Sequence, residues 1–205
     1  MNLVDYLSNY YFVAYVLVYV VFHIPFDLSM LIKKGKASYP TPSFESTLEG
    51  LSVVLSSCLF WLYLIASPII VLSSGKNIFV LDNIPEKIQL PFVIVGIIFM
   101  SVGLIIGCLG RIGRGTYLAR DKPKLATNWG HAIVRHPSYF LYITGFLGIP
   151  FAAFSPYLFI LYLGIPGYLI TTKLEEDVLI EAFGDEYKKY QEKVGRLFFK
   201  IKKKK

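Results

Sequence analysis

The sequence contains few of the residues that stabilise small soluble domains or bind metal ions. Its two cysteines, Cys58 and Cys108, lie inside apolar runs, which indicates core-filling side chains and not a disulfide or a thiolate metal site. Its three histidines, His23, His131 and His136, lack the helical pairing of metal ligands, so we expect no metal. No alternation of apolar and polar residues is long enough to predict a β-strand.

Charged residues are missing from long stretches of the chain. Residues 6–26, 51–75 and 88–110 contain no Asp, Glu, Lys or Arg, and each run reaches the ~20 residues that one membrane-spanning helix needs. The chain is 55% hydrophobic with a mean hydropathy of +0.54, which is typical of integral membrane proteins. We predict three transmembrane helices within residues 1–110. The first is expected to be retained, because no basic segment of a cleaved signal peptide precedes it.

A fourth uncharged run covers residues 137–172. Two legs of about 17 residues would each climb ~25 Å, just enough to cross the membrane and return. Pro150 and Pro156 bracket a turn near the midpoint. Apolar residues at helical spacing then continue to a break at Gly184, which predicts a C-terminal amphipathic helical segment. The predicted fold is an all-α integral membrane protein with five transmembrane helices, the last two a tight hairpin.

The distribution of positive charge predicts the orientation. With the N-terminus outside, 19 of the 21 Lys and Arg residues face the cytoplasm, as the positive-inside rule requires. The formal net charge of +7 flanks apolar runs and does not form a groove-facing stripe, so we expect a membrane surface as the partner and no nucleic acid.

Glycines recur near the end of the third run. Gly103, Gly107 and Gly110 have the spacing that lets a second helix approach closely, although glycine is also simply common in membrane helices. The glycine-rich residues 110–115 suggest a phosphate-binding loop, but such a loop requires a preceding strand, and here a membrane helix precedes it.

The predicted hairpin brings Glu175 and Glu176 back to the membrane face from which Arg135 and His136 depart. Arg135 offers a planar donor fork that suits a carboxylate, and His136 can change its charge near neutral pH. Adjacent helical carboxylates point about 100° apart and cannot both bind one small metal. This set would suit a zwitterionic ligand such as an amino acid or nucleoside derivative. Each residue also has an ordinary structural explanation, as flanking charge or as a helix start.

Three segments together resemble the isoprenylcysteine carboxyl methyltransferase family and its phospholipid methyltransferase relatives. They are Arg-His-Pro-Ser-Tyr at 135–139, preceded by Leu-Ala-Thr at 125–127; Glu175-Glu176; and Phe-Gly-Asp-Glu-Tyr-Lys-Lys-Tyr at 183–190. The resemblance covers about 80 C-terminal residues. It implies a methyltransferase that binds S-adenosylmethionine in a cytosol-facing pocket formed by residues 111–205, with a lipophilic methyl acceptor entering from the bilayer.

The resemblance also implies the roles of individual residues. Arg135 would be the catalytic residue and would hold the amino-acid portion of the cofactor together with neighbours in the same segment. The implied cofactor-binding residues are Leu125, Ala126, His131, Arg135, His136, Pro137, Tyr139, Glu175 and Glu176. Methyl transfer to a carboxylate needs no general base, so alignment and electrostatics would provide the rate.

The sequence departs from the family at the expected acceptor site. Thr171 stands where prenylcysteine enzymes carry an arginine that is expected to bind the acceptor carboxylate, so the acceptor stays open. His131 stands near where the family has a tyrosine, and it would either replace that contact or be a satisfied interfacial histidine. Two alternatives remain: an NADPH-dependent lipid reductase, because sterol reductases look similar around Arg-His-Pro-x-Tyr, and a non-catalytic membrane scaffold or small transporter.

Overall fold

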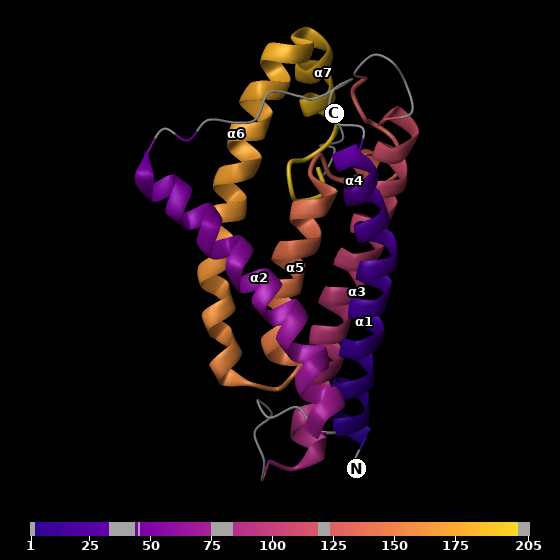
Figure 1. Ribbon diagram of the computed structural model, residues 1–205, viewed down its shortest axis with the longest axis vertical. Helices are drawn as coiled ribbons and strands as arrows, with labels where there is room; N and C mark the ends of the chain where they lie inside the picture. The colour runs from indigo at the N-terminus through magenta and orange to yellow at the C-terminus, as the bar shows by residue number, and fades with distance from the viewer. Residues whose placement is uncertain (1–2, 33–43, 45, 75–83, 119–123, 201–205) are drawn as a thin grey trace, which may run out of the picture.

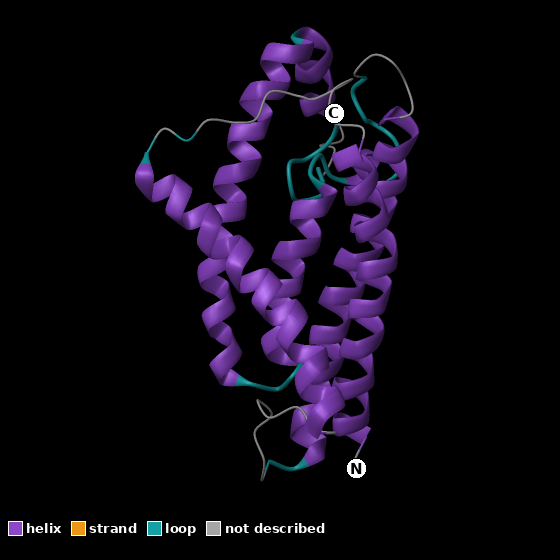
Figure 2. Ribbon diagram, in the orientation of Figure 1, coloured by secondary structure: helices purple, strands orange, loops and turns teal. Residues whose placement is uncertain are grey.

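The computed structural model describes residues 3–32, 44, 46–74, 84–118 and 124–200. Within this part of the chain the regular elements are all helical and no strand is present (Figure 2). In chain order they are α1 (Leu3–Ile32), α2 (Thr47–Ser74), α3 (Glu86–Leu118), α4 (Gly130–Ile133), α5 (Pro137–Ala152), the 3₁₀ helix η1 (Pro156–Gly164), α6 (Ile165–Phe183) and α7 (Asp185–Lys193).

Among the described residues, four helices are long and apolar enough to cross a membrane, within Leu3–Pro25, Thr47–Ala66, Glu86–Arg114 and Pro156–Phe183. They correspond to the three expected N-terminal helices and to the second leg of the expected hairpin, so the prediction of a helical membrane protein is confirmed. The first leg, α5, has 16 residues, which is shorter than the ~20 residues of an ordinary span. The expected total of five crossings is therefore not confirmed.

The hairpin itself is present. Figure 1 shows α5 running away from the end of the molecule that carries α4 and α7, and α6 returning to that end. The reversal falls at residues 153–155, between the two prolines, where Phe154 has a φ of 43°. The returning leg, Pro156–Phe183, has 28 residues whereas α5 has 16, so it projects beyond the start of α5 (Figure 1).

Close packing of α3 against α5 fixes the position of the hairpin. A Cβ atom on Gly107 would lie 2.9 Å from the Leu141 Cβ, and one on Gly110 would lie 2.5 Å from the Pro137 Cβ. A Cβ on Gly103 would overlap the Thr144 side chain. The expected close helix approach at these glycines is thus confirmed, and its partner is α5.

The third helix is longer than expected. The sequence predicts its end at residue 110, with a basic loop to follow, but α3 continues to Leu118. A charged residue ends a membrane span without ending a helix, since Arg is a good helix former once the helix has left the bilayer. The glycine-rich residues 110–115 therefore lie inside a helix, which excludes the phosphate-loop interpretation.

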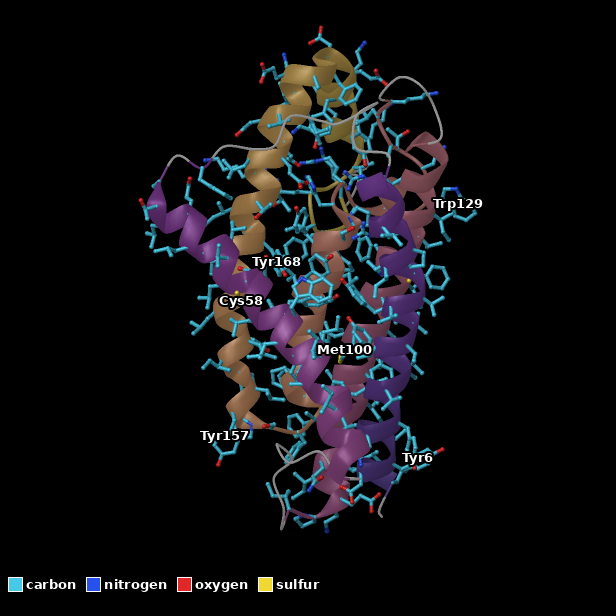
Figure 3. All side chains as sticks on the ribbon, in the orientation of Figure 1. Tyr6, Cys58, Met100, Trp129, Tyr157 and Tyr168 are labelled. Carbon is cyan, nitrogen blue, oxygen red and sulfur yellow. The ribbon has the colours of Figure 1, made fainter. Side chains whose placement is uncertain are left out.

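Aromatic side chains lie on the surface at both ends of the bundle. Tyr6 and Tyr157 project near one end and Trp129 near the other, whereas Met100 is buried between the helices (Figure 3). Amphipathic rings at two levels are typical of the two membrane–water boundaries. The helix α2 crosses the bundle obliquely and packs against α6 (Figure 1), where the Tyr168 hydroxyl donates to the Ser56 carbonyl at 3.3 Å.

Candidate functional site

The segment that leads into α5 is held by the C-terminal segment, which we define as residues 194–200. Val134 and Gly195 form an isolated parallel β-bridge. The Arg135 amide donates to the Gly195 carbonyl at 2.9 Å, and the His136 amide donates to the Arg196 carbonyl at 3.2 Å. Gly195 and Arg196 therefore attach to the segment before α5 through backbone pairing.

Arg135 and Glu176 meet, as the hairpin spacing predicts. The Arg135 Nε and Nη2 atoms each lie 2.7 Å from Glu176 Oε1. Both side chains are nearly buried, with 9% of Arg135 and 3% of Glu176 exposed. The remaining Arg135 nitrogen, Nη1, donates to the carbonyls of Gln191 (3.3 Å) and Val194. The guanidinium thus joins α6 to the C-terminal segment.

Arg196 is a member of this site that sequence reasoning missed. Its Nε and Nη2 atoms donate to Glu176 Oε2 at 2.9 and 2.6 Å. Gln191 Nε2 donates to the same oxygen at 3.3 Å. Arg196 lies outside the three recognised segments, in a lysine-rich part of the sequence. Only its closeness in sequence to the end of α7 could have indicated a role in the site.

Glu175 shares His136 with Glu176 and also has a partner of its own, Tyr139. The Tyr139 hydroxyl donates to Glu175 Oε1 at 2.6 Å, and His136 Nδ1 lies 3.4 Å from Glu175 Oε2. The side chain of Glu175 is 34% exposed. The two adjacent carboxylates thus meet different ring nitrogens of His136, as expected for side chains that diverge at consecutive helical positions, and Glu175 keeps an accessible edge.

His136 lies between the two carboxylates. Its Nε2 atom is 3.3 Å from Glu176 Oε1, while its Nδ1 atom faces Glu175. Carboxylates only accept hydrogen bonds, so this arrangement favours the protonated ring, in which both nitrogens donate. Burial alone would lower the pKa of His136, but the hydrogen bonds and charges of Glu175 and Glu176 outweigh it and raise the pKa above its ordinary value.

His131 does not join this cluster. Its Nδ1–H donates to the Arg135 carbonyl at 3.1 Å, and its own carbonyl accepts from the Tyr190 hydroxyl at 2.6 Å. Burial lowers the pKa of His131 to about 4, and the nearby charge of Arg114 contributes in the same direction. A neutral ring that supports the backbone of Arg135 agrees with the interfacial-histidine interpretation.

The other predicted residues are distributed around the cluster. Leu125 is buried against Tyr187 and Tyr190 of α7. It lines a surface pocket of about 420 Å³ whose other lining residues are Thr127, Ala132, Glu186, Lys189, Tyr190, Lys193 and Val194. Ala126 is half-buried and Pro137 is packed on Gly110. The hydrogen-bond and ion-pair partners of Arg135 and Glu176 described above include neither Leu125 nor Ala126.

A cluster of packed aromatic side chains continues from Tyr139, the partner of Glu175, into the core between α2, α5 and α6. The ring centroids of Tyr139 and Tyr168 lie 5.8 Å apart, and those of Tyr168 and Tyr142 lie 5.0 Å apart. Phe60 of α2 extends the series, 4.5 Å from Tyr142. Nearby, the Thr171 hydroxyl donates to the Gly167 carbonyl at 2.8 Å and so is already occupied by its own helix.

No group of three potential metal ligands occurs among the described residues. In a comparison with known protein families, no family model matches the chain. A comparison with curated proteins gives one relative, methanethiol S-methyltransferase from Pseudomonas sp. (strain GM41(2012)), which is 30% identical over 165 residues. The similarity is to a methyltransferase. The match covers 74% of this chain and 60% of the relative, so the chain spans less than two thirds of the length of that protein.

Proposed function

We propose that this protein is an integral membrane methyltransferase that uses S-adenosylmethionine as its methyl donor. The observation that carries the proposal is the convergence of Arg135, His136 and Tyr139 with Glu175 and Glu176 at one end of the bundle. The distant methyltransferase relative supports it. The proposal includes α5 as a short fifth crossing, with the N-terminus outside and this cluster at the cytoplasmic face. The alternation of helix directions in Figure 1 agrees with that topology.

The residues present fit the chemical groups of this donor. Glu175 has an exposed edge and spare acceptor positions, so it can bind the ammonium group or hydroxyls of the ligand. The imidazolium of His136 holds that carboxylate ionised and in place. The ring of Tyr139, beside Glu175, suits a cation such as a sulfonium, because the π-system is negative above the ring. When bound, S-adenosylmethionine supplies an electrophilic methyl group on that sulfonium.

The acceptor that fits best is a small apolar thiol. Its sulfur would take the methyl group as the methyl–sulfonium bond breaks, S-adenosylhomocysteine would leave, and the thiol proton would pass to solvent. Thr171 occupies the position of the expected carboxylate-binding arginine, and its hydroxyl is engaged by the Gly167 carbonyl. The aromatic cluster that continues into the core from the partner of Glu175 includes Tyr139, Tyr168 and Tyr142, which favours a neutral acceptor over a carboxylate because a buried carboxylate needs a charged partner. The relative's name specifies a thiol acceptor, and an apolar thiol can reach this cluster through the bilayer.

Calorimetry on detergent-solubilised protein tests donor binding. We expect S-adenosylhomocysteine to bind at micromolar concentrations, and Glu175→Gln to weaken that binding at least tenfold. Glu181→Gln, which makes the same change at an exposed position of α6, is the matched control and should bind as the wild type does. Absence of binding at high micromolar concentration, combined with protection against thermal unfolding by NADPH, would instead support the lipid-reductase alternative.

A second experiment identifies the acceptor. Membranes that contain the protein are incubated with donor labelled in the methyl group, together with either methanethiol or a prenylcysteine. We expect label in the volatile thioether and none in a prenylcysteine methyl ester. The reverse distribution would retain the methyltransferase and refute the thiol acceptor.

A further inference from the structure

The carboxylate of Glu176 is saturated by donors from the protein itself. Its Oε1 atom accepts from Arg135 and lies 3.3 Å from His136 Nε2. Its Oε2 atom accepts two bonds from Arg196 and one from Gln191. A carboxylate offers about four lone-pair positions, so the surrounding protein donors already exceed its capacity. Only 3% of the side chain is exposed, which leaves no edge for a ligand.

The donors to Glu176 come from three separate parts of the chain. Arg135 precedes α5, Gln191 belongs to α7, and Arg196 belongs to the C-terminal segment. Glu176 itself lies on α6. The side chain of Glu176 therefore joins both legs of the hairpin to α7 and to the C-terminal segment. This is the role of a structural junction and not of a ligand contact.

The junction acts together with other anchors of the C-terminal segment. Arg135 donates to the Val194 carbonyl, Lys200 donates to the Gln191 carbonyl at 3.1 Å, and the ring centroids of Phe199 and Phe140 lie 6.2 Å apart. Leu197 is 3% exposed and belongs to the apolar core, while Phe198 and Phe199 are exposed. Gly195 lies in a tight turn, since a Cβ there would overlap the Phe198 carbonyl. One β-bridge and two backbone hydrogen bonds complete the attachment to residues 134–136.

We propose that Arg196 is a positioning residue: through Glu176 it fastens the C-terminal segment against Arg135 and His136 and so holds the donor site in its binding geometry. In this arrangement the two adjacent carboxylates have separate tasks. Glu175 faces the ligand, and Glu176 joins the protein segments. The consequence for ligand binding rests on the proposed function, whereas the consequence for the C-terminal segment does not.

Hydrogen exchange of the ligand-free protein tests the attachment directly. The amides of Arg135 and His136 donate to the carbonyls of Gly195 and Arg196, so their exchange reports whether the C-terminal segment is docked. In Arg196→Ala we expect exchange of these amides to rise roughly tenfold, which corresponds to one charge-assisted interaction at a half-exposed site. Arg196→Lys keeps the charge and loses the fork, so an intermediate rise is expected.

Lys188→Ala is the matched control. It removes one positive charge from the same C-terminal region, but Lys188 is 60% exposed and forms its ion pair with the exposed Asp185. It should leave exchange at residues 135 and 136 unchanged. Glu175→Gln is the opposite control, because it should weaken ligand binding without raising exchange at those two amides.

Binding of S-adenosylhomocysteine to the same variants shows whether Arg196 positions the donor site or only attaches the C-terminal segment. We expect Arg196→Ala to weaken binding about tenfold, in proportion to the exchange change, and Arg196→Lys to restore part of it. Unchanged exchange in Arg196→Ala overturns the proposal. Raised exchange with unchanged binding also overturns it, because the segment would then not position the site. If the wild type binds no S-adenosylhomocysteine, the proposed function fails, and the exchange measurement alone still decides the attachment.

Discussion

Substitution of Gly110 by alanine tests whether helix packing sets the geometry of the site. The new Cβ would lie 2.5 Å from the Pro137 Cβ. Ordinary carbon–carbon contacts lie near 3.5–4.0 Å, so the two groups must separate by about 1 Å. Pro137 has a rigid ring and fixed φ and cannot rotate away. The displacement therefore passes to its neighbour, His136, which contacts both carboxylates.

The expected cost has two parts. Overpacking of the α3–α5 contact should destabilise the protein by ~1–3 kcal/mol. A misplacement of 1 Å at the site should lower methyl transfer on the order of a hundredfold. Thermal unfolding in detergent and labelled-methyl transfer measure the two effects. Gly50→Ala is the control, since its Cβ would lie 3.7 Å from Phe44 and no atom must move. A Gly110→Ala protein with wild-type stability and wild-type transfer would refute the reasoning.

Three further predictions concern the charged cluster. His136→Gln should lower the melting temperature most below pH ~6.5, and the difference from wild type should narrow as pH rises through the folded pKa, because a raised pKa gives stability only while the ring is protonated. Tyr139→Phe removes a 2.6 Å bond to Glu175 and should weaken S-adenosylhomocysteine binding about tenfold by calorimetry, whereas Tyr157→Phe should not. Glu176→Gln should destabilise the protein by roughly 2–3 kcal/mol in thermal unfolding, less than a fully buried pair would cost, because one of its partners is 43% exposed.

The sequence predicts the helical hairpin well because the constraint is geometric. An uncharged run of 36 residues with prolines near its middle can cross and return only by turning there, and the run ends next to Glu175. The meeting of Arg135 with Glu176 follows from that return. The separate directions of Glu175 and Glu176 follow equally from the ~100° between consecutive helical residues.

Other features depend on contacts that no local pattern encodes. The glycines at 103, 107 and 110 predict a close helix neighbour, but only the folded chain shows that the neighbour is α5. The first charge after the third uncharged run, Arg111, marks the end of the membrane span but not the end of the helix, so the sequence does not predict that α3 continues to Leu118. The sequence does not decide the role of His131, because a cofactor contact and a satisfied interfacial histidine both place a polar side chain at the membrane–water boundary.

Arg196 explains why motif analysis finds part of this site and overlooks the rest. The recognised segments are local, and each presents its residues from one helix start or one helix face. Arg196 reaches Glu176 only because a parallel backbone pairing returns residues 195 and 196 to residues 134–136. Such pairing uses backbone amide and carbonyl groups that every residue except proline carries, so it leaves no side-chain pattern in the sequence. Arg135 and Arg196 share the carboxylate of Glu176, so Arg135 is itself held in place by the C-terminal segment. The ability of Arg135 to position a ligand therefore depends on a segment outside the motif.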